Sequence, residues 1–154
     1  MAGAGGPAFA IVVARFYAEL ADRLLASAGP VLREAAGGAD PDVYDVPGAF
    51  ELPLAALYAA ESGRYAGVVC LGAVIRGETS HYDHVCAEAA RGIQDVALRT
   101  GVPCAFGLLT VETMDQALAR SGGAKRDQGR HAAEAVLALA GLRDRLAPAA
   151  GGML

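Results

Sequence analysis

The chain has few cysteines, and their spacing suits neither a disulfide framework nor a metal site. Its 154 residues include three cysteines, and no C-x-x-C pair occurs among them. Cys70 and Cys104 fall in apolar segments typical of strands, and Cys86 falls in a segment with helical periodicity. We therefore expect three reduced thiols that contribute to packing.

A third soft ligand for a metal ion is also lacking. His81 and His84 are three residues apart and share a predicted helix face with Asp83 and Glu88, which could begin a metal site. No further soft ligand follows at a suitable spacing. The sequence thus predicts no bound metal.

The chain has neither a basic surplus nor a long apolar run. Its formal net charge is −4 and its pI is about 5.3, and no basic stripe is interleaved with aromatic residues. No apolar run is long enough to cross a bilayer, and residues 1–7 lack the basic segment that begins a secretory signal. We expect a cytoplasmic protein that binds neither nucleic acid nor membrane.

What the chain does have is an excess of alanine. Hydrophobic residues make up 54% of the sequence and the mean hydropathy is +0.33. Partner subunits are needed to cover so much apolar surface, so we expect a homo-oligomer. The length suits one domain spanning residues 1–154, with flexible ends at residues 1–7 and 147–154.

Apolar runs alternate with segments of helical periodicity along the whole chain. This alternation predicts βαβ units and a central parallel sheet of four strands, that is, a flavodoxin-like three-layer α/β/α sandwich. Pro30 is expected to kink or end the first helix. The expected strands are residues 9–14, 42–46, 68–75 and 102–109, and the expected helices begin at residue 16, span 50–60, follow residue 80 to about 101, and span 114–119 and 131–146.

The segment most suggestive of chemistry is residues 72–84, G-A-V-I-R-G-E-T-S-H-Y-D-H, where an apolar strand gives way to glycine and hydroxyl residues. Gly77 allows a tight turn, and Thr79 or Ser80 can cap the following helix, whose free N–H groups favour phosphate. His81 falls in the first helical turn, where the helix dipole favours a neutral ring that can accept a proton. An ordinary strand-to-helix loop with a surface histidine is an equally good interpretation.

Parallel α/β sheets bind ligands beyond the carboxyl ends of their strands, which places the loops at residues 15–17, 47–51 and 75–81 together with the loop after residue 109. Phe16 offers an aromatic face for a flat ring, although periodicity alone favours a core staple. Glu51 can accept hydrogen bonds from ligand hydroxyls or act only as a solvated helix-start carboxylate. Arg120 precedes a polar connection at residues 121–130 and suits phosphate, as do many surface arginines.

Three segments together resemble the lumazine synthase family: V-P-G-A-F-E-L-P at residues 46–53, residues 72–86, and residues 102–110. The resemblance extends from Ala10 to about Leu139 with the spacings kept. It implies the penultimate step of riboflavin synthesis, in which a transferase condenses 5-amino-6-ribitylaminouracil with 3,4-dihydroxy-2-butanone 4-phosphate to give 6,7-dimethyl-8-ribityllumazine. It also implies that no metal or organic cofactor takes part.

The resemblance assigns roles to individual residues. His81 is the residue expected to move protons, and the site is expected to be completed across a subunit boundary. By similarity, Phe16 stacks on the uracil ring, Ala49, Phe50 and Glu51 hold the ribityl chain, Ala73, Val74 and Ile75 contact the pyrimidine edge, Gly77, Glu78 and Thr79 bind phosphate, and Phe106 and Arg120 come from the adjoining protomer.

Two positions depart from the family pattern, because relatives commonly carry Asn at Tyr17 and Lys at Gln128. Arg126 or Arg130 is a candidate for replacing the lost charge. The departures leave open a slow lumazine-synthase-like shell or a flavin-binding protein. A flavodoxin-like nucleotide-binding module is disfavoured, because residues 14–17 are poorly suited to a phosphate loop.

Assembly is also implied by the resemblance, since relatives form pentamers, decamers and shells of sixty subunits. We expect a pentamer as the minimal unit. Residues 120–128 carry no insertion that would prevent a shell of sixty, and riboflavin synthase is a candidate partner.

Overall fold

The computed structural model describes residues 7–148, in which strands and helices alternate as predicted. The strands pair in parallel in the order β2-β1-β3-β4. The chain runs through β1 (Phe9–Ala14), α1 (Ala18–Ala35), β2 (Asp42–Val46), a short 3₁₀ helix η2 (Ala49–Glu51), α2 (Leu52–Glu61), β3 (Gly67–Ile75), α3 (His81–Thr100), β4 (Cys104–Val111), α4 (Met114–Ala119) and α5 (Gln128–Leu146).

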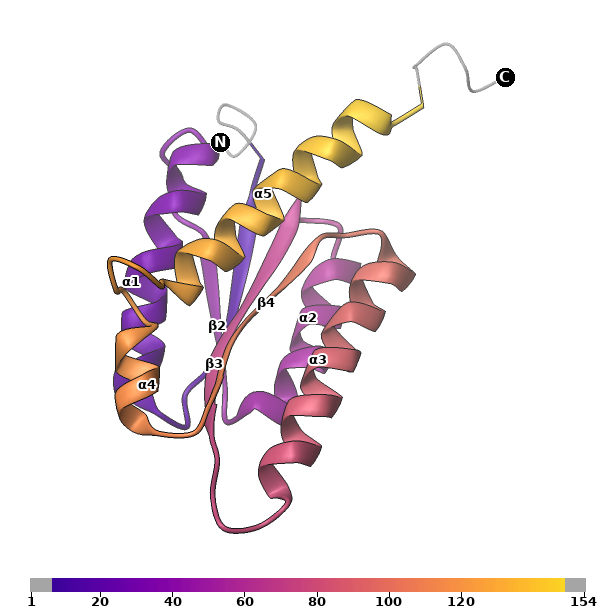
Figure 1. Ribbon diagram of the computed structural model, residues 1–154. Helices are drawn as coiled ribbons and strands as arrows, with labels where there is room; N and C mark the ends of the chain where they lie inside the picture. Colours follow the sequence, from indigo (N-terminus) through magenta and orange to yellow (C-terminus); the bar gives the residue numbers. More distant parts are fainter. Residues whose placement is uncertain (1–6, 149–154) are drawn as a thin grey trace.

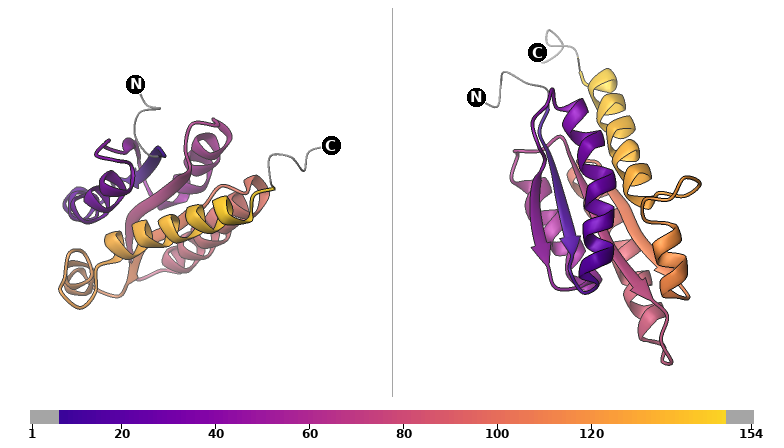
Figure 2. Two further views of the ribbon diagram at one scale, coloured as in Figure 1. Left: turned by 90° about the horizontal axis from the view of Figure 1, so that it is seen from above. Right: turned by 90° about the vertical axis from the view of Figure 1, so that its left-hand side faces the viewer.

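Helices cover both faces of the sheet, which confirms the three-layer α/β/α arrangement. Helices α1, α4 and α5 lie on one face, and α2 and α3 lie on the other (Figures 1 and 2). Successive residues of β1 point to opposite faces, so Ile11 and Val13 pack under α1 and α5 while Ala10 and Val12 pack under α2 and α3. The continuous apolar character of the two central strands follows from this double burial.

Strand β2 forms one edge of the sheet and, unlike β4 at the other edge, is mostly exposed. Its side chains are mostly exposed, and Val43 and Tyr44 expose 45% and 38% of their surface. Within residues 7–148 no other strand pairs with its outer edge. An open strand edge of this kind is a ready template for another chain.

Several boundaries differ from the sequence prediction, most of all those of α1, β4 and α5. Helix α1 continues through Pro30 to Ala35, so the expectation that Pro30 could end the helix was wrong. Pro30 is exposed, whereas Leu24, Ala28 and Leu32 on the other side of the helix are fully buried, and this packing outweighs the lost backbone hydrogen bond.

Strand β4 begins and ends two residues later than predicted, and α5 begins three residues earlier. The early start of α5 has a clear cause, because the Asp127 carboxylate accepts a hydrogen bond from the Arg130 N–H and caps the helix. The predicted flexible ends fall mostly on residues 1–6 and 149–154, which lie outside the described range.

Of the helices in the described part of the chain, none is long and apolar enough to cross a bilayer.

Candidate active site at the carboxyl ends of the strands

A cleft lies where the sequence prediction put it, beyond the carboxyl ends of β1, β2 and β3. Its volume is about 430 Å³. Three of the four predicted loops contribute to it, which agrees with the general rule for parallel sheets. The lining residues are Phe16, Tyr17, Gly48, Ala49, Phe50, Glu51, Ala73, Val74, Ile75, Gly77, Thr79, His81, Tyr82 and Val85.

The loop after β1 is fixed by Arg15, which leaves Phe16 free. Arg15 Nη1 lies 2.6 Å from Asp22 Oδ1 and Arg15 Nε lies 3.0 Å from Asp45 Oδ1, and hydrogen bonds to these two carboxylates raise the pKa of the guanidinium. Phe16 is 75% exposed and meets the Tyr17 ring edge-on, with 4.9 Å between ring centroids. Phe16 is therefore not the core staple that periodicity favoured, and its face is open to a flat ligand.

The turn after β2 is held by a carboxylate. Glu51 Oε1 accepts a hydrogen bond of 2.9 Å from the Gly48 N–H, and this contact closes the turn at the start of η2. Ala49 is buried, whereas Phe50 is 61% exposed at the cleft. Glu51 is thus a helix-start carboxylate that also lines the cleft. The structural interpretation and the ligand-binding interpretation of this residue are therefore compatible.

The loop between β3 and α3 brings His81 into the cleft. Helix α3 begins at His81, as predicted, and residues 77–81 are exposed. Ser80 occupies the N-cap position without a side-chain cap bond, while Thr79 Oγ1 accepts a hydrogen bond of 3.3 Å from the His81 N–H. A Cβ atom at Gly77 would meet nothing within 4 Å, so the loop has room for a ligand beside it.

Tyr82 and Val85 line the cleft although the sequence analysis did not assign them to it. Burial raises the pKa of Tyr82, whose side chain also contacts Cys86 and Thr110. Their spacing could have indicated this, because Tyr82 and Val85 are three residues apart and therefore lie on the same side of the first turns of α3.

A second group of predicted residues lies outside this cleft. The Gln128 Nε2 amide donates a 3.3 Å hydrogen bond to the Phe106 carbonyl, and the Gln128 N–H donates one of 2.9 Å to the Arg120 carbonyl. Phe106, Arg120 and Gln128 are therefore neighbours of one another, but none of them lines the cleft that contains His81. Glu78 is exposed and is not part of the lining either.

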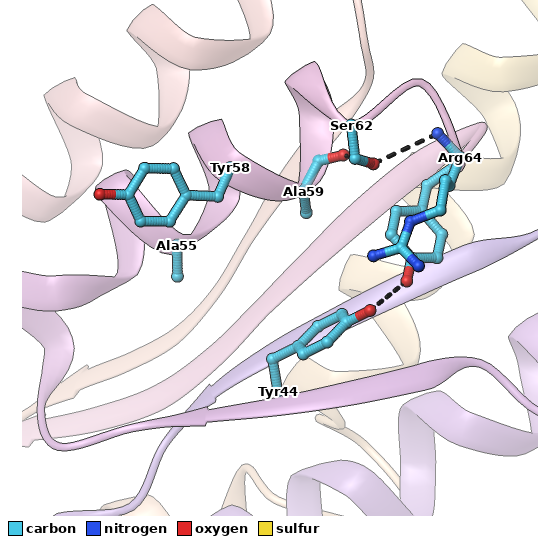
Figure 3. A pocket seen from close by; sticks show the side chains of 7 residues that line it. Tyr44, Ala55, Tyr58, Ala59, Ser62 and Arg64 are labelled. Atoms are coloured by element: carbon cyan, nitrogen blue, oxygen red, sulfur yellow. Dashed lines mark hydrogen bonds between the residues drawn. The ribbon is translucent and has the colours of Figure 1, made fainter.

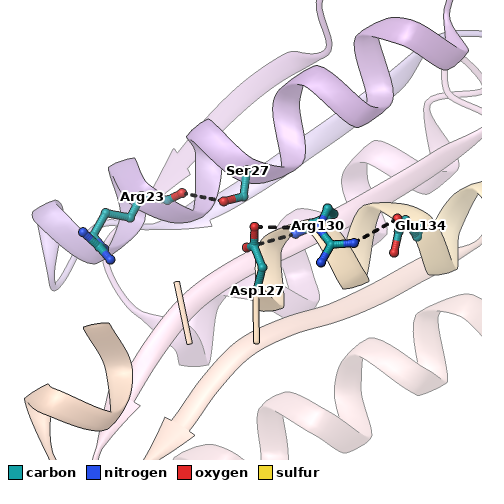
Figure 4. Close-up of polar contacts among 5 residues, drawn as sticks. All are labelled: Arg23, Ser27, Asp127, Arg130 and Glu134. Atoms are coloured by element: carbon teal, nitrogen blue, oxygen red, sulfur yellow. Dashed lines mark hydrogen bonds and ion pairs between the residues drawn. The ribbon is translucent and has the colours of Figure 1, made fainter. Parts of the chain in front are cut away.

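Two side chains of the polar connection before α5, Asp127 and Arg130, are engaged in polar contacts (Figure 4). Arg130 contacts Asp127 at 3.9 Å and Glu134 at 3.4 Å, so its charge is already balanced. Arg23 donates to Ser121 Oγ at 2.9 Å and to the Leu118 carbonyl at 3.0 Å, which ties α1 to the end of α4. Arg130 is therefore a poor substitute for a cation at position 128.

A smaller pocket of about 200 Å³ lies between β2 and α2 (Figure 3). The Tyr65 hydroxyl donates a 2.6 Å hydrogen bond to Asp42 Oδ2 and is also hydrogen-bonded to the Tyr44 hydroxyl. Burial and these contacts raise the pKa of Tyr65. The Tyr44 and Tyr65 hydroxyls are thus occupied by each other and by Asp42, and no histidine, cysteine or carboxylate comparable to His81 is among the described residues that line the pocket.

The cysteines lie in the predicted elements and are free. Burial raises the pKa of Cys104 to about 11 and keeps that of Cys70 well above its ordinary value, so both thiols are neutral packing groups. Within residues 7–148, no three His, Cys, Asp or Glu side chains gather as a metal-binding group.

Comparison with known proteins gives a consistent result. A family model described as 6,7-dimethyl-8-ribityllumazine synthase matches residues 6–144. A protein of that name from Desulfatibacillum aliphaticivorans is 44% identical over 143 residues, which cover 92% of each chain. One from Desulfotalea psychrophila is 47% identical over 144 residues, covering 93% of each chain, and one from Gloeobacter violaceus is 51% identical over 119 residues, covering 74% of this chain and 66% of its own.

Proposed function

Because the chain belongs to the 6,7-dimethyl-8-ribityllumazine synthase family, we propose that the cleft containing His81 is where it condenses 5-amino-6-ribitylaminouracil with 3,4-dihydroxy-2-butanone 4-phosphate. The observation that carries this proposal is the meeting of three features in one cleft. An exposed aromatic ring, Phe16, lies with the Gly48–Glu51 turn and with the exposed loop that ends at His81.

Each part of the cleft suits one part of the substrates. The open face of Phe16 can stack on the pyrimidine ring, and the backbone at the end of β3, at Ala73 to Ile75, can pair with its polar edge. The turn from Ala49 to Glu51 presents backbone groups and a carboxylate to the ribityl hydroxyls. The N–H groups at the start of α3, beside Gly77 and Thr79, suit the phosphate of the second substrate.

In this proposal His81 moves protons during the condensation. The amine of the pyrimidine attacks the ketone, and loss of water gives a Schiff base. The carbon that carries the neighbouring hydroxyl then loses a proton as phosphate leaves the adjacent carbon, and the resulting enol tautomerises to a new carbonyl. The ribitylamino nitrogen attacks this carbonyl, which closes the ring with loss of a second water. The imidazole in the first turn of α3 accepts a proton from the attacking amine and returns it to a departing oxygen.

We further propose that an adjoining protomer supplies Phe106 and Arg120. These two residues lie beside Gln128 and apart from the cleft of their own chain, so they are available to a neighbour. The exposed edge of β2 and the alanine-rich surface are the features that support assembly. A cytoplasmic homopentamer is the proposed minimal unit, with a sixty-subunit shell as its larger form and riboflavin synthase as a candidate partner.

The slow-shell and flavin-binding alternatives receive no support, since the relatives above all carry the synthase name. Incubating the purified protein with both substrates tests the activity directly. We expect lumazine absorbance to appear together with one equivalent of inorganic phosphate. Failure to form lumazine from two competent substrates would overturn the proposal, and light scattering tests the pentamer separately.

A further inference from the structure

The phosphate-side loop of the cleft has few contacts with the body of the protein. Residues 77–80 are exposed, and a Cβ at Gly77 would meet nothing within 4 Å. The side-chain hydrogen bond in the loop, from the His81 N–H to Thr79, is local. The position of the loop therefore depends on what holds its two ends, at β3 and at the first turn of α3.

Arg76 joins both ends to a third element. Its backbone N–H donates a 2.9 Å hydrogen bond to the Val111 carbonyl at the end of β4. Its Nε lies 2.9 Å from Glu112 Oε1, and its Nη1 lies 3.4 Å from Asp83 Oδ1 in the first turn of α3. Its Cζ lies 4.3 Å from the centroid of the Tyr82 ring.

The anchor at Glu112 is itself held in place. The Glu112 N–H donates a 2.8 Å hydrogen bond to Gln116 Oε1 in α4, and Thr113 caps that helix by accepting from the Gln116 N–H at 3.1 Å. Glu112 thus belongs to a folded corner between β4 and α4. A guanidinium that reaches this corner fixes the start of α3 relative to the sheet.

We propose that Arg76 is a positioning residue, which sets the phosphate-side loop and the His81 imidazole against the cleft through Glu112, Asp83 and Tyr82. The inference rests on the proposed function, because it concerns how that site is held. Arg76 acts through other residues, since its charge is already shared between two carboxylates and its face is covered by the Tyr82 ring.

Variants at both ends of the contact separate this role from direct phosphate binding. Arg76→Gln and Glu112→Gln each remove the ion pair while keeping a polar side chain of similar length. If Arg76 only positions the loop, both variants lower kcat and raise KM for the butanone phosphate about 3- to 10-fold, and KM for the pyrimidine stays within about twofold. The double variant should be no worse than Arg76→Gln, because the two changes break one interaction.

Arg99→Gln provides a matched control. Arg99 and Asp95 form an exposed ion pair of 2.9 Å on the same helix, away from the cleft. We expect this variant to behave like the wild type, and Arg76→Lys to recover part of the activity because it keeps the charge without the planar stacking. Thermal unfolding of all variants should stay close to that of the wild type, as for other exposed pairs.

Three outcomes would overturn the proposal. If Glu112→Gln is neutral or tightens phosphate binding while Arg76→Gln weakens it, then Arg76 contacts phosphate directly. If the effects of the two variants multiply in the double variant, the residues do not act as a unit. If Arg76→Gln matches Arg99→Gln, Arg76 has no role in the site.

Hydrogen exchange in the free protein tests the same inference without turnover. We expect amides of residues 77–84 to exchange several-fold faster in Arg76→Gln and Glu112→Gln than in the wild type, and to be unchanged in Arg99→Gln. If exchange in Arg76→Gln and Glu112→Gln equals that of the wild type, and the wild type makes lumazine, then only the positioning role is refuted. Absence of lumazine from the wild type refutes the proposed function, while the exchange data still decide whether Arg76 holds the loop.

Discussion

Replacing His81 by alanine should slow lumazine formation without abolishing it. A well-oriented general acid or base contributes about 10²- to 10⁴-fold to a reaction rate. The His81 side chain is exposed, and within residues 7–148 no hydrogen bond orients its ring. Its contribution should therefore lie near the lower end, about 100-fold in kcat, which corresponds to about 2.7 kcal/mol of transition-state stabilisation.

Most of the acceleration should survive because it does not depend on the imidazole. A condensation of two substrates gains chiefly from holding the amine and the ketone at attack distance, and Phe16, Glu51 and the phosphate-side loop remain in the variant. KM for both substrates should accordingly stay within about threefold of the wild type. These lining side chains come from three separate loops, so removing one ring leaves the others in place.

The assay is the initial rate of lumazine absorbance, with each substrate varied in turn. His84→Ala is the matched control, since His84 is also exposed near the start of α3 but does not line the cleft. It should match the wild type. A loss of more than about 10⁴-fold in His81→Ala with both KM values intact would show that proton transfer, and not positioning, dominates the rate. An unchanged kcat would remove His81 from the mechanism.

Three further predictions follow from other parts of the chain. Arg120→Ala should raise KM for the butanone phosphate far more than KM for the pyrimidine, and equal effects on both in steady-state assays would contradict its assignment to phosphate. Gly107→Ala should lower the free energy of unfolding by about 1–3 kcal/mol, because the added Cβ would lie 2.7 Å from the Cys70 carbonyl oxygen, whereas Gly141→Ala, with nothing within 4 Å, should not destabilise the protein in the same denaturant titration. Burial raises the pKa of Cys104 from 9.0 to about 11, so the thiol ionises at lower pH in the unfolded chain than in the folded one. The free energy of unfolding should therefore fall as the pH rises from about 9 to 11. Cys104→Ala should show a smaller fall, and an identical fall would exclude this cause.

The fold followed from the sequence because the strands and helices differ in period. Continuous apolar runs marked the two central strands, β1 and β3, and the glycine at Gly101 marked the end of α3, where it takes a positive φ of 73°. The possibility that Pro30 would end α1 was wrong because local propensity says nothing about the buried face on the other side of the helix. Propensity is a weak guide where a long amphipathic helix packs against a sheet.

The cleft was less fully predictable than the fold. Phe16 looked like a core staple, because no sequence pattern tells whether an aromatic at a helix start turns inward or outward. The hydrogen bond from Gln128 to the Phe106 carbonyl joins residues 22 positions apart, and the contact between Arg76 and Glu112 spans 36 positions. Pairings of this kind depend on how β4 lies beside β3, which the sequence does not specify residue by residue.

The separation of His81 from Arg120 within one chain has a genetic consequence. In a ring of identical protomers built as proposed, each copy gives an imidazole to one catalytic unit and a guanidinium to the next. Suppose that copies defective at position 81 assemble with copies defective at position 120. Where two different copies meet, one arrangement gives a catalytic unit with both defects, and the opposite arrangement gives a unit with neither. Two impaired alleles expressed together should therefore complement each other, although neither encodes a competent polypeptide.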